Sequence, residues 1–212
     1  MARRRAPGRP GGDSEDLRRR LIEAALACYA REGVAAASIK LIASEAGVTP
    51  ALLHYYFGNR ELLRQAVIDN RILPLLRGVQ EQLASVDGDV GALISAFVVA
   101  MNRAIADNPW WPALWVREVL CEGGALREVL IEQVGQAFLD TFVQRFARAQ
   151  GAGKLNPDLD PRLLPVSLIG LTLFPAAGAP VWRKLLHADD IDAEAQQHHT
   201  LALLQRGLEL RS

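Results

Sequence analysis

Apolar residues recur along this chain at the spacing of amphipathic helices. Leu17, Leu21 and Cys28 fall on one face of a helix that Asp13–Ser14 can cap and that Gly33 can end. Helical spacing continues to the end of the chain, with no alternating strand pattern and no internal repeat. The sequence therefore predicts an all-α protein.

Capping residues and glycines divide this pattern into separate helices. A capping side chain, or a proline in the first turn, marks each start, and glycine marks several ends. Pro74 should kink or break one long helix near Ile72, because proline has no amide hydrogen to donate to the preceding turn. The predicted helices cover about 14–32, 39–46, 50–56, 60–86, 90–106, 109–122, 125–150, 161–174 and 193–210.

Composition and charge divide the chain into a basic head and an acidic body. Half of the 212 residues are hydrophobic, which is ample for a buried core. Residues 1–60 carry ten Lys or Arg against six Asp or Glu, and residues 61–212 carry fourteen against eighteen. This asymmetry suits a protein that touches a polyanion at one end. The predicted domains are a disordered basic arm at 1–12, a small domain at 13–58 and a larger one at 59–212.

The two cysteines and the longest apolar run bear on the compartment. Cys28 and Cys121 have no paired spacing and lie in apolar helical contexts, which favours buried thiols in a reducing compartment. No secretory signal follows the basic start. The apolar run at 163–179 is interrupted by Pro165 and Pro175, so it is too short for a membrane span. We expect a soluble, cytoplasmic protein with no membrane association.

The segment Ser38–Leu63 predicts a helix-turn-helix. Two short helices flank Gly47, and Ala43 is small enough for the helices to cross closely. In such a motif the second helix enters the major groove of DNA with its N-terminal residues toward the bases. The apolar residues expected to pack the pair are Ile39, Ile42, Ala43 and Ala46 with Val48, Leu52 or Leu53, and Tyr56 or Phe57.

Residues expected to face outward in this segment suit a phosphate-rich partner. Thr49 combines a hydroxyl with a helix N-terminus, where backbone amides favour an anion. Hydroxyl, imidazole and cationic groups at these positions usually contact phosphates and fix the register on DNA. The outward residues with this chemistry are Ser38, Lys40, Thr49, His54, Tyr55 and Arg60.

The same segment resembles the signature of the TetR family of transcriptional regulators. The resemblance is carried by Ile42-Ala43, Ala46-Gly47-Val48-Thr49, Leu53, Tyr55-Tyr56-Phe57 and Arg60-Glu61-x-Leu63. It covers about 50 residues with the preceding helix, and the later helices match only in number and rough length. It implies an N-terminal helix-turn-helix domain and a larger C-terminal helical domain.

The resemblance also implies roles for single residues. Lys40 matches a base or phosphate contact, Pro50, Ala51 and Leu52 match the groove-facing tip, His54 and Tyr55 match a backbone-contacting pair, and Arg60 matches a phosphate-binding lysine. Three positions depart from the family pattern: Ala51 is often Gly, His54 is often Tyr, and Leu52 is often small and polar. Readout by Ala51 and Leu52 would rely on thymine methyl groups or on DNA shape.

For the larger domain the resemblance implies a ligand cavity and a dimer surface. The dimer would use the last two long helices, at about 161–174 and 193–210, although their leucines could equally form an intramolecular core. Those leucines are Leu163, Leu164, Leu168, Leu171, Leu201, Leu204 and Leu208. The candidate cavity walls are Phe97, Met101, Trp110, Trp111, Trp115 and Phe138, with Arg117 and Glu118 as polar anchors, and core packing is the alternative for each.

Together with the helix-turn-helix pattern, the resemblance implies a ligand-responsive repressor that binds a palindromic operator as a homodimer, with an unknown small-molecule effector. An enzyme using Arg117, Glu118 or Cys121 and a purely structural scaffold are the alternatives. His187, His198 and His199 lack the spacing of a metal site, and no cofactor motif occurs. The arm's Gly8-Arg9-Pro10 resembles a minor-groove hook, with a solvated tail as the alternative.

Overall fold

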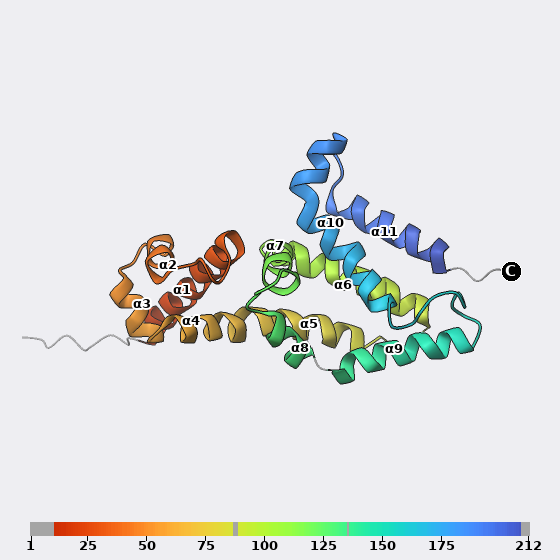
Figure 1. Cartoon of the computed structure of the whole chain (residues 1–212), viewed down its shortest axis with the longest axis horizontal. Coiled ribbons are helices and arrows are strands. Elements are labelled where there is room, and N and C mark those ends of the chain that lie inside the picture. Colours follow the sequence, from red (N-terminus) through yellow and green to blue (C-terminus); the bar gives the residue numbers. More distant parts are fainter. Residues whose placement is uncertain (1–10, 87–88, 135, 209–212) are drawn as a thin grey trace, which may run out of the picture. The chain divides into compact units, whose positions relative to one another are not determined.

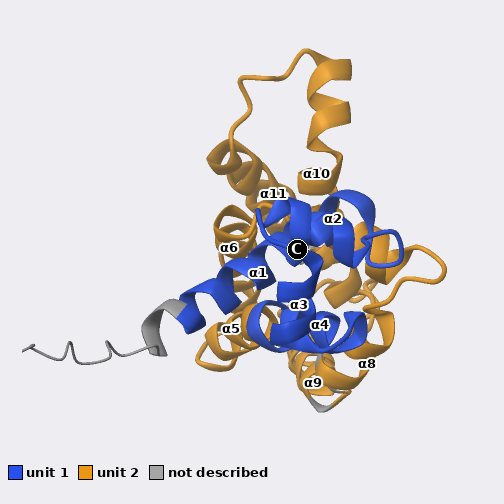
Figure 2. Cartoon of the chain, turned by 90° about the vertical axis from the view of Figure 1, so that its left-hand side faces the viewer, with its two compact units in different colours: residues 1–72 blue, residues 73–212 orange. Residues whose placement is uncertain are grey.

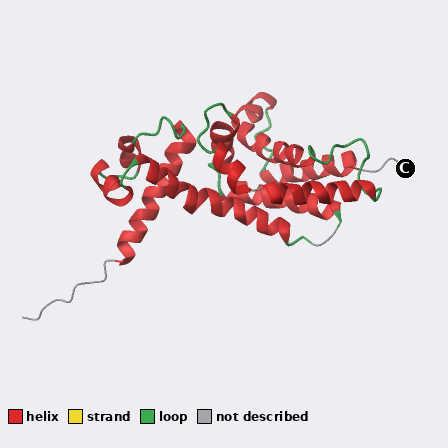
Figure 3. Ribbon diagram, turned by 60° about the horizontal axis from the view of Figure 1, so that its bottom comes forward, coloured by secondary structure: helices red, strands yellow, loops and turns green. Residues whose placement is uncertain are grey.

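The computed structural model describes residues 11–86, 89–134 and 136–208. Every regular element in these residues is a helix (Figure 3), which confirms the all-α prediction. Contacts divide the chain into unit 1, Met1–Ile72, and unit 2, Leu73–Ser212 (Figure 2). The expected arm lies outside the described residues up to position 10, whereas residues 11 and 12 already belong to the first helix.

Unit 1 is a small bundle around the first helix. Its helices are α1 (Gly11–Glu32), α2 (Ile39–Glu45), α3 (Pro50–Phe57) and α4 (Arg60–Val67), followed by a π-helical turn, η1 (Ile68–Ile72). Helix α1 packs against α2 and α4, and α3 packs against α2 and α4. The residues that fill its core include Leu21, Ala25, Leu26, Tyr29, Ile42, Ala43, Leu53, Leu63 and Val67.

Side-chain caps begin α2, α3 and α4 at the residues that the sequence indicates. The Ser38 hydroxyl accepts the Leu41 amide at 3.1 Å, Thr49 accepts the Leu52 amide, and the Asn59 carbonyl accepts the Leu62 amide. Each cap satisfies an amide that the first turn of a helix leaves without a backbone acceptor. These three helix starts are confirmed.

The kink or break expected near Ile72 is a π-helical turn in the structure. Residues Ile68–Ile72 adopt π geometry, and α5 (Leu73–Ala84) follows directly. Pro74 cannot donate to the carbonyl four residues earlier, so the α-helical ladder is interrupted at this point. The helix from Arg60 to η1 belongs to unit 1, although the sequence placed it with the larger domain.

Unit 2 is a larger bundle built around α6 (Val90–Asp107). Helix α6 (Figure 1) contacts α5, α9, α10 and α11. Its buried side chains include Leu93, Phe97 and Met101. The other elements are α7 (Trp111–Trp115), a second π-helical turn η2 (Val116–Leu120), α8 (Arg127–Val134), α9 (Gln136–Gly151), α10 (Leu164–Leu186) and α11 (Ala193–Leu208).

Helix starts in unit 2 differ from the expectation at Asn108 and Asp160. Helix α7 begins at Trp111, three residues after Asn108, and the Asn108 side-chain amide donates to the Ala104 carbonyl of α6 at 3.0 Å. The Asp160 carboxylate binds the backbone and guanidinium of Arg162, and α10 begins four residues later. At both sites the regular helix therefore begins a few residues later than the sequence pattern predicts.

Two other elements also have different bounds. The single amphipathic helix expected up to about residue 150 is α8 and α9 in the structure. Helix α10 passes through Pro175 and Pro180 and ends at Leu186, where His187 adopts a left-handed conformation with φ of 52°. The Trp182 indole donates to the Pro175 carbonyl at 2.8 Å, so one side chain contacts the backbone beside a proline inside the helix.

Candidate nucleic-acid interface

Helix α3 has one buried side and one exposed side. Leu53 and Phe57 are buried in unit 1, and the Arg18 guanidinium lies 5.2 Å from the centre of the Phe57 ring. The exposed residues of α3 and its cap are Thr49, Pro50, Ala51, His54 and Tyr55, and Leu52 is half-buried. The end of the helix that the sequence assigned to the major groove is therefore accessible.

Tyr55 is the most prominent side chain on this surface. It is 82% exposed, and its ring packs edge-on against Tyr56 with 5.5 Å between ring centres. The Tyr56 hydroxyl lies 3.3 Å from the Ser14 hydroxyl at the start of α1. Tyr56 is thus half-buried and tied to α1, while the Tyr55 hydroxyl is free of the core and suited to a phosphate oxygen.

His54 closes the end of α3. Its Nδ1 lies 2.9 Å from the Gly58 carbonyl, and because a carbonyl oxygen only accepts, Nδ1 carries a hydrogen. Nε2 is then the nitrogen that remains for a partner, and it can donate to phosphate only when the imidazole is protonated. The side chain is exposed, as a backbone-contacting role requires.

Arg60, which the sequence predicts to contact phosphate, makes backbone contacts within unit 1. Its guanidinium donates to the backbone carbonyls of Val34 and Ala35, the latter at 2.7 Å, in the connection between α1 and α2. These two hydrogen bonds stabilise the connection between α1 and α2. A sequence pattern could not reveal this, because the acceptors lie 25 and 26 residues earlier.

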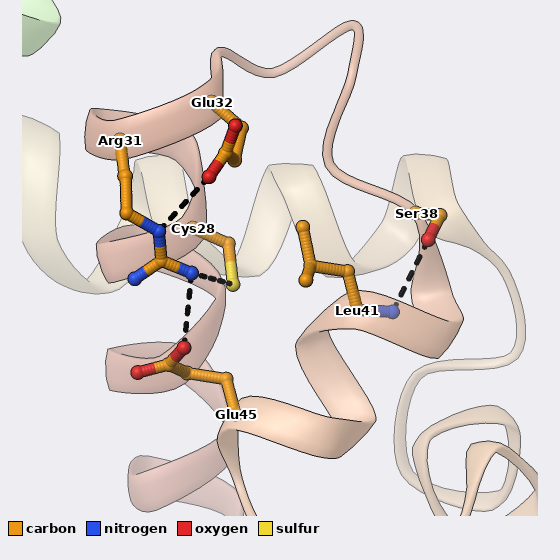
Figure 4. Close-up of polar contacts among 6 residues, drawn as sticks. All are labelled: Cys28, Arg31, Glu32, Ser38, Leu41 and Glu45. Carbon is orange, nitrogen blue, oxygen red and sulfur yellow. Dashed lines mark hydrogen bonds and ion pairs between the residues drawn. The ribbon is translucent and has the colours of Figure 1, made fainter.

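The N-terminal end of α2 contributes exposed Ser38 and Lys40. The other end of α2 is tied to α1 by Arg31, which donates to Glu32 and to Glu45, both at 3.0 Å, and approaches the Cys28 sulfur (Figure 4). Burial raises the pKa of the Cys28 thiol, the largest effect on that group. Cys28 is therefore a neutral buried thiol, as expected.

Comparison with known proteins identifies the motif. Residues 21–67 match the family model described as bacterial regulatory proteins, tetR family. The chain is 29% identical over 162 residues to the HTH-type transcriptional regulator SrpR of Pseudomonas putida, covering 76% of this chain and 71% of SrpR. HTH-type transcriptional regulator UidR of Escherichia coli is 25% identical over 165 residues, covering 76% and 80%. Residues 21–67 are a helix-turn-helix domain of the TetR family.

The fold of this chain also resembles that of a solved transcriptional regulator over almost its whole length. The solved ketosteroid transcriptional regulator KstR2 of Mycobacterium tuberculosis superposes with a TM-score of 0.74 at 19% identity, covering 98% of this chain and 100% of that one. The matched family model and the curated relatives, rather than this fold, identify the chain as a helix-turn-helix transcriptional regulator. Within the residues that the structure describes, two helices, α6 and α10, are long and apolar enough to cross a membrane, but core helices of soluble proteins meet the same criterion.

Unit 2 of the TetR-family chain contains an apolar cavity of about 430 Å³. Five of the predicted wall residues line it: Phe97, Met101, Trp111, Trp115 and Phe138. Its aromatic side chains also contact one another, since Phe138 and Phe142 have ring centres 5.2 Å apart and Trp111 and Trp115 have theirs 6.4 Å apart. A cavity of this size and lining is typical of a small-molecule site.

Three expected cavity residues, Trp110, Arg117 and Glu118, do not line it. Glu118 is only 5% exposed, and its carboxylate accepts the Ala125 amide at 2.9 Å across the η2–α8 turn. Glycine is required at position 124, because a Cβ there would lie 2.3 Å from the Glu118 carbonyl oxygen. The Glu118 carboxylate therefore stabilises this turn and does not line the cavity.

Several functional candidates escaped the sequence reasoning. The cavity is also lined by Gln80, Gln136 and Asp140, whose polarity gave no signal because amphipathic helices carry such residues on their solvent faces. Cys121, expected to be buried, is exposed where η2 ends. Within the described part of the chain, no group of three or more His, Cys, Asp or Glu side chains could hold a metal ion.

Proposed function

We propose that this TetR-family chain is a ligand-responsive repressor that binds a palindromic operator in double-stranded DNA as a homodimer. The observation that carries the proposal is the exposed start of α3. Thr49, Pro50, Ala51 and Tyr55 face solvent while buried Leu53 holds the helix in unit 1. In this geometry a recognition helix can enter the major groove with its first turn toward the bases.

Contacts with DNA would divide between bases and phosphates. Pro50, Ala51 and Leu52 at the start of α3 offer only apolar surface, which suits thymine methyl groups. Lys40, Thr49, His54 and Tyr55 would contact phosphates, together with Ser38 at the start of α2. We do not assign a phosphate to Arg60, because its guanidinium already donates to two backbone carbonyls.

A second copy of the chain would pack on α10 and α11. Exposed apolar side chains on α10 include Val166, Phe174, Val181 and Leu185, spaced eight, seven and four residues apart, and such spacing places them on one helix face. In Figures 1 and 2 the C-terminal half of α10 projects from the rest of unit 2. Leu164, Leu168 and Leu204, which the sequence offered for the dimer, are buried in the monomer instead.

In this proposal, binding of an effector in the cavity controls the affinity for DNA. An effector in unit 2 would favour a conformation in which the paired α3 helices no longer match successive major grooves, about 34 Å apart. Affinity for the operator would fall by the difference between the effector's affinities for the two conformations. A protein that acts on chromosomal DNA would work in the cytoplasm.

Two substitutions on the proposed interface test DNA binding. Genomic fragments captured by the protein supply the operator, and fluorescence anisotropy measures affinity across salt concentrations. Tyr55→Ala should weaken binding about tenfold by loss of a phosphate contact. Lys40→Ala should weaken it and lower the salt slope by about one.

Lys154→Ala, at an exposed lysine of unit 2, is the matched control and should change neither value. Arg60→Ala is unsuitable as a test because it also removes the loop contacts with Val34 and Ala35. Wild-type affinity in both Tyr55→Ala and Lys40→Ala would exclude this surface as the DNA-binding site.

A further inference from the structure

The unit 2 cavity changes chemistry between its deep end and its mouth. Phe97, Met101, Trp111 and Phe142 are each no more than 6% exposed and form an apolar, largely aromatic interior. Ile131 and Leu139 are 69% and 40% exposed, and Asp140 is also exposed, so α8 and the start of α9 form the mouth. A ligand would therefore bury its apolar part and keep a polar group near Asp140.

The mouth of the cavity carries a negative charge. Asp140 is the only charged side chain among the described residues that line the cavity, and Gln80 and Gln136 are the other polar ones apart from it. Its neighbours one helical turn away on α9 are Gln136 and Gln144, and neither is charged. No salt bridge within the described residues involves its carboxylate.

We infer that the effector is a compact aromatic or polycyclic amine rather than a carboxylic acid, an inference that rests on the ligand-responsive function proposed above. An anion at the mouth would face the Asp140 carboxylate with no lining cation to balance it. An ammonium group would be attracted to that carboxylate, and aromatic rings such as Trp115 and Phe138 would also favour a cation.

Three fluorescent probes that share one ring system distinguish a preference for a cationic ligand from a preference for a neutral or an anionic one. They are 9-(aminomethyl)anthracene, 9-anthracenemethanol and 9-anthracenecarboxylic acid, which differ mainly in being cationic, neutral and anionic at neutral pH. Binding is titrated by fluorescence with the full chain and without DNA. The amine should bind about tenfold more tightly than the acid, with the alcohol between them.

The substitution Asp140→Asn tests whether the preference for the amine probe arises at the cavity. It should weaken binding of the amine about threefold to tenfold, strengthen binding of the acid and leave the alcohol unchanged. Asp190→Asn, at an exposed carboxylate of the loop between α10 and α11, is the matched control and should change none of the three. Equal or tighter binding of the acid, failure of all three probes to bind, or an unchanged amine affinity in Asp140→Asn would overturn the inference.

A second titration in the presence of operator DNA separates this inference from the function on which it rests. Release of DNA by the amine supports both. Tight, Asp140-dependent amine binding without DNA release would overturn the ligand-responsive function and leave the ligand class standing. Tighter binding and DNA release by the acid would support the function and overturn the ligand class.

Discussion

Burial of the Tyr29 hydroxyl lowers the stability of the folded chain. Tyr29 is among the largest fully buried side chains, and its hydroxyl has no hydrogen-bond partner within the described residues. Burial raises the pKa of this phenol to about 12, although Arg60 and Arg64 oppose the shift. A buried polar group without a partner costs stability, so Tyr29 contributes through its ring and not through its hydroxyl.

Tyr29→Phe should therefore retain or raise the free energy of unfolding, by up to about 1 kcal/mol below pH 10. Because the native pKa is above the value of 10 in the unfolded chain, the unfolded state loses its proton first, and stability falls as the pH rises from 10 toward 12. The variant should lose less stability over this range than the wild type. Urea unfolding at pH 8 and pH 11 measures both effects, and a variant clearly less stable at pH 8 would contradict this account.

Short elements dominate unit 1. Helices α2, α3 and α4 have seven, eight and eight residues, which is too few to be stable in isolation. Their side-chain caps and the packing on α1 stabilise them. The turn between α2 and α3 depends on Gly47, whose φ of +67° is the left-handed region, with the Val48 amide donating to Ala43 at 2.9 Å.

Gly47→Ala should lower the free energy of unfolding by about 1–2 kcal/mol through backbone strain alone, since a Cβ at this position would meet nothing within 4 Å. The matched control is Gly78→Ala, also with an unobstructed Cβ but inside the right-handed helix α5. It should raise stability by up to about 1 kcal/mol. Thermal and urea unfolding report both, and equal effects of the two substitutions would refute the role of the turn.

At the scale of the whole molecule, each unit has its own core, and the surface proposed for a second copy lies on unit 2. The exposed face of α10 combines Val166, Phe174, Val181 and Leu185 with the exposed Gly170 between the first two. Glycine on such a face lets another helix approach closely, and a contiguous apolar face on a soluble protein marks an interaction site. Self-association would bury it.

Val181→Glu combined with Leu185→Glu should raise the dimer dissociation constant by more than about 100-fold, because each buried apolar side chain contributes about 1.5–3 kcal/mol. Sedimentation velocity over a range of concentrations measures this. Leu120→Glu is the control: this leucine is 60% exposed and belongs to η2 rather than to α10 or α11, so its substitution should leave association unchanged. A double variant that associates like the wild type would move the interface elsewhere.

The sequence by itself determined the elements that depend on nearby residues. Ser38, Thr49 and Asn59 accept amides three residues ahead, and Gly47 requires only its own backbone angle. Local partners of this kind are visible in a linear pattern. The helix-turn-helix and its exposed face followed from them, and so did the resemblance to the TetR family.

Only the tertiary structure decided where longer or more ambiguous side chains lie. Arg60 donates to carbonyls 25 and 26 residues away. Trp111 lines the cavity, whereas Trp110 does not. Asp140 also lines the cavity, although its sequence pattern predicts only an amphipathic helix. Helix α10 continues through two prolines that predicted its end. These outcomes depend on which distant segments pack together, and a sequence pattern records a residue's spacing without naming the partner it will meet.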